Sequence, residues 1–262
     1  MKTKHFFYFI VLLALGVAAA SCEKDDDSFI DSNTKVPKNA TFTSTDKDGK
    51  ATDTTSVDYS YDAQKRITII QFSEIDGEGN ATPLLKFDYT YNADNLVNKA
   101  RLVWGVNFQD AVFTYNANKE ITKIVYGGQI SKTVDVTYSS KGYLLDNATV
   151  KLSYDIHQVF NIQTSSSSLA YSYEENMLNG YSNLGAQIGV PTFFLILKTE
   201  LMYLYLFYPN TGNAGVLKEA QLQGGFLFQF TNEKDKLGFV TKSKFINGIT
   251  KKTVTVTYTY QK

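Results

Sequence analysis

The sequence predicts an all-β fold, mainly an antiparallel meander of repeated hairpins that forms a curled sheet or a partly closed barrel, with a short α-helical insertion near residues 191–208. Two observations predict the sheet: apolar and polar residues alternate with a period of two, and a tyrosine-containing motif recurs along the chain. The composition agrees, because 18 Tyr and 18 Phe in 262 residues favour half-buried strands, in which a ring buries its body and keeps a polar edge wet.

The repeated motif begins after Ser56. Val57–Ala63 (VDYSYDA) recurs as Phe87–Ala93 (FDYTYNA) and again as Val112–Ala117 (VFTYNA). The anchor tyrosines of successive copies are 30, 24 and 23 residues apart, a spacing that fits one two-stranded unit per repeat. These anchor tyrosines are Tyr61, Tyr91, Tyr115 and Tyr138.

Within each copy, alternate residues such as Val57, Tyr59 and Tyr61 point to one face, and the residues between them are polar. This pattern is typical of an antiparallel strand with one face buried and one in water. A turn follows each Tyr-Asp or Tyr-Asn pair, because Asp and Asn side chains accept hydrogen bonds from backbone amides two residues on. The return strands predicted after these turns are Ile67–Phe72, Leu96–Trp104 and Ile121–Tyr126. Further turns are predicted at Asp46–Gly49, Asp76–Asn80 and Gly127–Gly128.

The stretch Tyr59–Thr68 (YSYDAQKRIT) resembles the YD repeat of Rhs-type surface and toxin-shell proteins. The chain as a whole resembles an uncharacterised family of Bacteroidetes surface lipoproteins built from such repeats. The resemblance is good over Ser56–Tyr154 and looser elsewhere. It implies a β-meander with no known catalytic residues, and the chain has too few units to enclose a chamber as Rhs shells do.

Residues 1–21 have the pattern of a signal peptide, with Lys2 and Lys4 before the unbroken apolar run Phe6–Ala20. The run is shorter than the ~20 residues of a comfortable membrane span. Ala19-Ala20-Ser21-Cys22 resembles a lipoprotein box, in which the cysteine is lipidated and becomes the new N-terminus, although its first position is more often leucine. The alternative is ordinary cleavage after Ala20, which would release a soluble protein with a free thiol.

The residues after Cys22 are charged. Lys24, Asp25, Asp26 and Asp27 resemble the acidic export signal of Bacteroidetes surface lipoproteins; the alternative is a solvated charge run that opens a linker. We therefore expect an outer-membrane, lipid-anchored and surface-exposed protein, with the membrane as its partner through Cys22 and palmitate among its acyl chains. The predicted organisation is a leader over 1–21, a tether over 22–55 that leads into a first weak strand at Ala40–Ser44, and a β domain over 56–262 with an insertion at 176–225.

The insertion breaks the alternation. Phe193–Tyr208 is apolar nearly throughout, and Leu197, Leu201 and Leu204 recur at helical spacing after Pro191. This favours a helix packed on the sheet. A pair of buried strands is the runner-up, and an amphipathic patch that faces a membrane or partner is a third reading.

The composition excludes several classes of site. A single cysteine excludes an intramolecular disulfide and a cysteine zinc cluster, and a formal charge of zero gives no basic footprint for nucleic acid. His157 is the only histidine after the leader and lacks a nucleophile motif beside it. We therefore expect no metal, no cofactor and no enzymatic activity. A carboxylate-based glycoside hydrolase is the least favoured alternative, with its candidate acids at Asp62, Asp88, Asp135 and Asp155.

The favoured function is a non-enzymatic module that binds a glycan or a protein ligand. The alternative is a structural or accessory protein of the envelope that docks a partner through residues 190–208. Trp104 and Tyr126 are the candidate residues for stacking on a ligand, because aromatic rings on an open sheet face bind sugar rings. Core packing is the competing explanation for most of the tyrosines.

Overall fold

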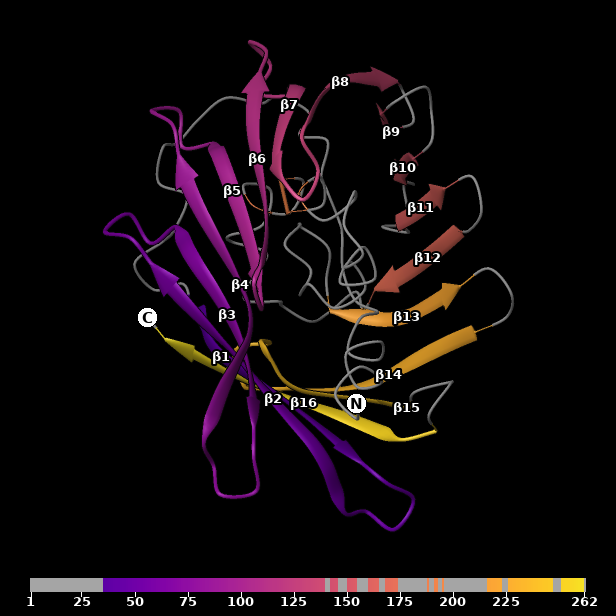
Figure 1. Cartoon of the computed structure of the whole chain (residues 1–262). Coiled ribbons are helices and arrows are strands. Elements are labelled where there is room, and N and C mark those ends of the chain that lie inside the picture. The colour runs from indigo at the N-terminus through magenta and orange to yellow at the C-terminus, as the bar shows by residue number, and fades with distance from the viewer. Residues whose placement is uncertain are drawn as a thin grey trace.

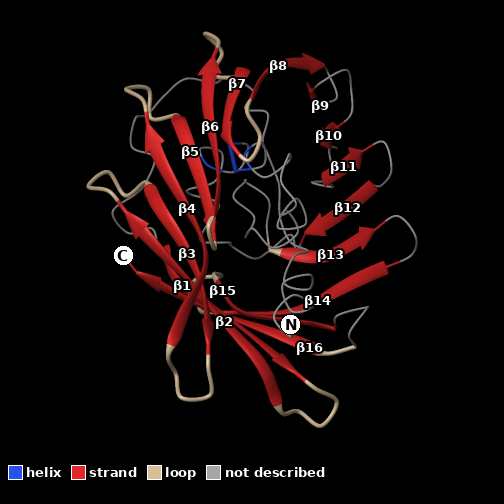
Figure 2. Ribbon diagram, in the orientation of Figure 1, coloured by secondary structure: helices blue, strands red, loops and turns tan. Residues whose placement is uncertain are grey.

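The computed structural model describes residues 35–139, 142–145, 150–154, 160–164, 168–173, 216–222, 226–246 and 251–261, together with Ile188, Pro191, Thr192 and Leu195. These residues form an antiparallel β-meander, which confirms the predicted fold class (Figure 2). The first eight strands are β1 (Val36–Thr45), β2 (Ala51–Tyr61), β3 (Ile67–Ile75), β4 (Ala81–Tyr91), β5 (Val97–Trp104), β6 (Asn107–Tyr115), β7 (Ile121–Gly128) and β8 (Lys132–Ser139). The others are β9 (Gly142–Leu145), β10 (Val150–Tyr154), β11 (Phe160–Thr164), β12 (Ser168–Tyr173), β13 (Leu217–Leu222), β14 (Phe226–Lys234), β15 (Val240–Ile246) and β16 (Thr253–Gln261).

Each strand pairs with its neighbours in the sequence, and the first strand also pairs with the last. The register between β1 and β16 extends from Val36 opposite Gln261 to Thr45 opposite Thr253. The pairing order is therefore cyclic, and the strands surround a common interior (Figure 1). Closing the order in this way leaves neither terminal strand of the meander with an unpaired edge.

The repeat turns share one geometry. Asp62 is typical: its amide donates to the Arg66 carbonyl at 3.0 Å, and its Oδ1 accepts from the amides of Gln64 and Arg66 at 3.0 and 2.9 Å. The fourth residue, Lys65, has φ 58°, which closes the bulged turn. The same bonds recur at Asp46, Asp76, Asn92, Asn116 and Asp235. The turns predicted from Asp and Asn are therefore confirmed, including the hairpin turn at Asp46–Gly49.

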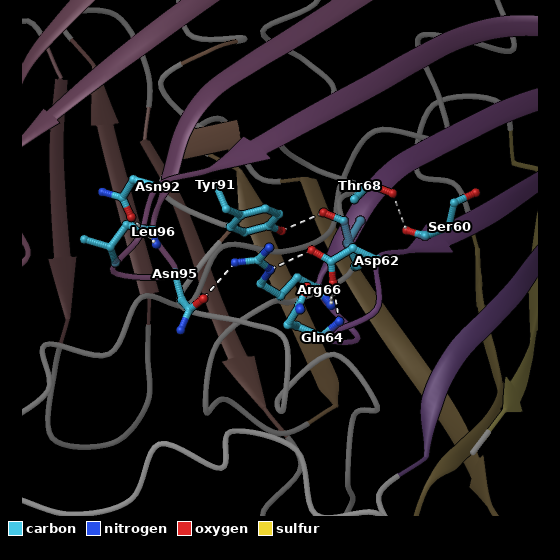
Figure 3. A network of polar contacts seen from close by, with 10 residues as sticks. Ser60, Asp62, Gln64, Arg66, Thr68, Tyr91, Asn92, Asn95 and Leu96 are labelled. Atoms are coloured by element: carbon cyan, nitrogen blue, oxygen red, sulfur yellow. Dashed lines mark hydrogen bonds and ion pairs between the residues drawn. The ribbon is translucent and has the colours of Figure 1, made fainter.

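One arginine connects two neighbouring turns (Figure 3). The Arg66 Nε donates to Asp62 Oδ2 at 2.7 Å, and its Nη1 donates to Asn95 Oδ1 in the next turn, also at 2.7 Å. Its guanidinium lies 4.5 Å from the centre of the Tyr91 ring. The turns of successive repeats are thus tied to one another by side chains as well as by the sheet.

Three of the anchor tyrosines, together with Tyr260, form a ladder beside these turns. The hydroxyl of Tyr91, at the end of β4, donates to the carbonyl of Ile67, at the start of β3, at 2.6 Å. Burial raises the pKa of Tyr91 far above its ordinary value, so the phenol stays protonated as a donor. Equivalent bonds connect Tyr61 to Pro37, Tyr115 to Val97 at 2.7 Å, and Tyr260 to Val240 at 2.6 Å.

The two faces of the sheet differ sharply in polarity. We call the face with buried side chains the inner face and the opposite one the outer face. On β4, Leu85, Phe87 and Tyr89 are buried, whereas Lys86 and Asp88 are half-exposed. The same alternation continues through β2, β5 and β8, so the core lies within the ring of strands. The predicted period of two is therefore confirmed.

Within the predicted insertion over 176–225, the structure describes four residues that are all helical and buried, and also β13. Because β13 is a strand of the meander, the predicted end of the insertion at residue 225 is too late. Thr192 donates to the carbonyl of Ile188 at 2.6 Å and shares a 2.7 Å hydrogen bond with the hydroxyl of Tyr89 on β4. Figure 2 shows these helical residues within the ring of strands. This agrees with a helix packed on the sheet, although most of the predicted span 191–208 lies outside the described residues.

Two further boundaries differ from prediction. The β domain begins at β1, so the predicted tether over 22–55 is too long: the weak strand predicted at Ala40–Ser44 is part of a ten-residue strand, and β2 begins at Ala51. Thr and Ser are so frequent here that the alternation is hard to detect in the sequence. Gly127 and Gly128 lie in β7 rather than in the turn, which follows them.

Candidate binding surface

The outer face of β5–β7 carries apolar side chains where the other repeats carry polar ones. In the third repeat, Val112 on β6 pairs with Val125 on β7, and their side chains are 42% and 43% exposed. The pair therefore forms an apolar patch at a position of the outer face where the first two repeats are polar. The equivalent pairs of the first two repeats are Asp58 with Gln71, and Asp88 with Arg101.

An aromatic ring extends this surface towards the end of β6. Phe108 pairs with Val103 on β5 and is 38% exposed. The guanidinium carbon of Arg101 lies 4.5 Å from the ring centre. On the other side, a Cβ at Gly128 would stand 3.0 Å from two ring carbons and 2.5 Å from the Phe108 carbonyl oxygen, so only glycine fits. The ring is thus fixed in place by its neighbours.

A charged row separates the two apolar rows. Asp110 lies between Phe108 and Val112 on β6, and its carboxylate is 3.5 Å from both Lys99 Nζ and Arg101 Nε. The Asp110 Oδ1 atom is buried and accepts no hydrogen bond from the part of the chain that is described. At 3.5 Å both ion pairs are longer than a direct hydrogen bond, and partly exposed pairs of this kind contribute little to stability. We call Arg101, Val103, Phe108, Val112 and Val125 the β5–β7 surface.

The composition of the β5–β7 surface suits contact with another protein. Aromatic residues and arginine are enriched at the centres of protein interfaces. Because Arg101 covers one face of the Phe108 ring, a sugar could stack there only by displacing the guanidinium. Aliphatic and aromatic side chains of a partner, with a carboxylate near Arg101, would fit without that rearrangement.

The two stacking candidates predicted from the sequence lie elsewhere. Tyr126 is buried on the inner face of β7, with 2% of its surface exposed, so it is a core residue rather than an open platform. Trp104 is half-buried at the end of β5, opposite Asn107, and stays a candidate. The sequence analysis missed the β5–β7 surface. The available signal was that Val112 takes the place of the aspartates at positions 58 and 88 in the other repeats.

The anchor residues Cys22, Lys24, Asp25, Asp26 and Asp27 lie outside the described residues, and their roles stay predictions. The described chain begins at Lys35. Its Nζ lies 2.6 Å from the Asp235 carboxylate and 5.6 Å from the centre of the Phe239 ring. The Lys35 ammonium holds the pKa of Asp235 below its ordinary value. The chain segment entering β1 is therefore fixed to the turn between β14 and β15.

The predicted absence of catalysis and of metal stays a prediction. Asp62 caps a turn and pairs with Arg66, and Asp88 pairs with Lys86 at 3.0 Å. Asp135 is exposed on β8, whereas Asp155 and His157 lie outside the described residues. Among the residues that were placed, no cluster of three or more histidine, cysteine or acidic side chains has the geometry to hold a metal ion. In the same residues, no helix is long and apolar enough to cross a membrane.

Neither a family model nor a curated protein matches the sequence. Solved structures do resemble the fold. A porin-like protein from Bacteroides uniformis superimposes with a TM-score of 0.52 at 14% identity, over 86% of this chain and 98% of that chain. A porin-like protein from Bacteroides vulgatus covers 87% of this chain and 99% of its own with a TM-score of 0.36 at 12% identity. A chain of the Photorhabdus luminescens Tc holotoxin pore gives 0.27 at 10% identity, over 76% of this chain and 12% of its own. The chain therefore shares the antiparallel β fold of the first of these porin-like proteins.

Proposed function

We propose that this protein is a lipid-anchored lipoprotein of the outer membrane, displayed at the cell surface, and that its β domain is a non-enzymatic module that binds a partner protein through the β5–β7 surface. The observation that carries the binding role is the exposed Val112–Val125 pair, at a position where both other repeats place a polar pair. Because both other repeats fold with a polar pair at this position, the fold does not require apolar side chains there. A partner that covers the valines would gain about 25 cal/mol per Å² of apolar surface.

Two features support the anchored location, and the length of the tether sets how far the β domain would stand from the membrane. Cys22 follows a leader with the charge and apolar pattern of an exported protein, and an acidic run follows it directly. The fold resembles that of a porin-like protein from a Bacteroides species. Only 12 residues separate Cys22 from Lys35, so the anchored body would stay within about 45 Å of the lipid surface.

The binding role is tested by giving the third repeat the polar pair of the second. Val112→Asp with Val125→Arg copies the Asp88–Arg101 pair, so the variant should fold normally while losing the apolar surface. The matched control is Thr114→Asp with Lys123→Arg, which changes a polar pair one row away on the same two strands. A photo-crosslinking residue at position 112, in living cells, identifies the partner, and one at position 58 reports background.

We expect one adducted protein from position 112 and none from position 58. With that partner purified, we expect the valine variant to weaken binding by at least about tenfold, since roughly 1.4 kcal/mol of apolar contact is lost. The control pair should leave the affinity unchanged. Equal affinity for the valine variant and the control would refute the proposed surface.

A glycan ligand is the second candidate, and Trp104 is the residue that favours it. Its ring is half-buried at the end of β5, beside the turn with the fully exposed Val106. As the only tryptophan in the chain, it reports directly on stacking by a sugar. A glycan array followed by titration of tryptophan fluorescence tests this. A shift in Trp104 emission on binding, together with loss of binding to the array in Trp104→Ala, would favour a glycan over a protein partner.

A further inference from the structure

We infer that the β domain is a sealed body that stands in water, with its polarity opposite to that of a barrel that spans a membrane and without a conducting channel. The inference goes beyond the proposed binding role and does not depend on the anchor at Cys22. It rests on the inner face, on the helical residues that cover it, and on the outer face.

On the strands whose side chains are described, the inner face is mostly apolar and inaccessible to solvent. Phe87, Leu102 and Ile124 come from three different strands and are at most 1% exposed. A spanning barrel with this many strands leaves a wide, polar, water-filled lumen, so its inward side chains stay wet. Here the inward side chains are packed against one another, as in the Phe72–Phe87 pair with ring centres 6.2 Å apart.

Helical residues of the insertion complete this packing. Ile188, Thr192 and Leu195 are at most 1% exposed. The Thr192 hydroxyl donates its single proton to the Ile188 carbonyl, so in the 2.7 Å contact with Tyr89 the tyrosine is the donor. A buried hydrogen bond between β4 and a helical residue 103 positions further along the chain fixes the segment against the inner face.

The outer face is charged at the level where a membrane barrel is apolar. Lys86 and Arg101 lie in the middle of β4 and β5, and Lys123 lies near the start of β7, all with side chains directed outward. Asp88, Asp110 and Asp135 lie on the same face of β4, β6 and β8. The outward apolar band of a membrane barrel has no counterpart in the described strands β2–β8, apart from the β5–β7 surface.

Thiol labelling of the full-length protein tests the sealed interior. Thr192→Cys places a thiol in the interior, Thr133→Cys places one on the outer face, and the wild-type chain gives the background from Cys22. A water-soluble maleimide should label position 133 at once and position 192 on the order of 100-fold more slowly, because labelling there requires the core to open. Both positions should react equally in urea. If Thr192→Cys does not fold, Ala100→Cys on the inner face takes its place.

Equal labelling of the inner and outer positions in the native protein would overturn the sealed interior. In proteoliposomes, an environment-sensitive fluorophore at Thr133→Cys should emit as in water and resist quenching by nitroxides on the lipid acyl chains. Quenching there, or stepwise conductance in a planar bilayer, would overturn the inference even if Cys22 proves to carry lipid. If Cys22 carries no lipid but the Thr192→Cys thiol is labelled slowly, the anchor is refuted and the sealed interior is not.

Discussion

Removing one hydroxyl from the tyrosine ladder should cost measurable stability. In Tyr91→Phe the ring keeps its position and its 4.5 Å contact with Arg66, but the 2.6 Å hydrogen bond to the Ile67 carbonyl is lost. A buried hydrogen bond contributes about 0.5–1.5 kcal/mol, and a partner left unsatisfied costs more. We therefore expect the free energy of unfolding to fall by about 1–2 kcal/mol.

The assay is urea denaturation followed by Trp104 fluorescence and circular dichroism. For a domain of this size, a loss of this magnitude corresponds to a fall in Tm of about 2–8 °C. Thr114→Val is the control, because it removes an exposed hydroxyl from β6, beside the equivalent tyrosine Tyr115. We expect Tyr115→Phe to match Tyr91→Phe, since its bond to Val97 has the same geometry. If Tyr91→Phe loses no more stability than Thr114→Val, the ladder is not a source of stability.

Three further predictions concern the turns, the entry of the chain and the glycine beside Phe108. Lys119 has φ 64° at the turn position that is glycine in the turns beginning at Asp46, Asp76 and Asp235, so Lys119→Gly should raise the free energy of unfolding by roughly 0.5–1 kcal/mol. No change or a loss would contradict this account of the turn. Asp235 has a lowered pKa in the folded state, so its pairing with Lys35 stabilises the protein above the unfolded pKa of ~3.9 and is lost as the pH falls through the lower folded value. Asp235→Asn keeps the turn hydrogen bonds but should lower the free energy of unfolding by about 0.3–1 kcal/mol at pH 7. It should also make stability less dependent on pH in the acid range. An unchanged dependence of stability on pH would show that the Lys35–Asp235 pair contributes nothing. Gly128→Ala should lower the free energy of unfolding by about 2–4 kcal/mol, because φ is 106° and the new Cβ would stand 2.5 Å from a backbone carbonyl oxygen of β6. Gly127→Ala is the control and should be neutral, because the nearest atom to its new Cβ is 3.9 Å away. Equal effects of the two substitutions in thermal unfolding would refute the steric argument.

The strands and turns of the repeats could be predicted from the sequence because the local signals within each repeat agree with one another. Val57–Tyr61 and Phe87–Tyr91 alternate strictly, and Asp62 and Asn92 follow as turn caps, so strand, face and turn are predicted together. The start of the β domain could not be predicted, because β1 and the first half of β2 consist largely of Thr, Asn and Ser. β1 takes up its strand conformation by pairing with β16, which is far away in the sequence, and β2 pairs with β3. No signal in the sequence shows which strand each of them pairs with.

The candidate surface was missed for a related reason. When β6 is considered alone, Val112 is predicted to be an ordinary buried strand residue, because the alternation is judged one strand at a time. Its outward direction becomes clear only when the third repeat is aligned on the first two. Phe108 and Arg101 come together through the register between β5 and β6, which sequence spacing does not specify.

The polarity of the outer face decides how such a body can reside in an envelope. An Arg or Lys directed at the lipid near the middle of a bilayer costs about 2–4 kcal/mol. Lys86 and Arg101 point outward from the middle of their strands, so insertion of these strands into lipid is unfavourable by roughly 4–8 kcal/mol from these two alone. Attachment by acyl chains on one cysteine avoids this cost, because each buried methylene contributes about 0.8 kcal/mol without exposing the sheet to lipid.

The most direct test of this account is intact-mass and peptide mass spectrometry of the protein purified from the membranes of its native host. The account predicts a mature chain that begins at Cys22 and carries a diacylglyceryl thioether on its sulfur. A mature chain that begins at Ser21, with an unmodified Cys22 thiol, would contradict it.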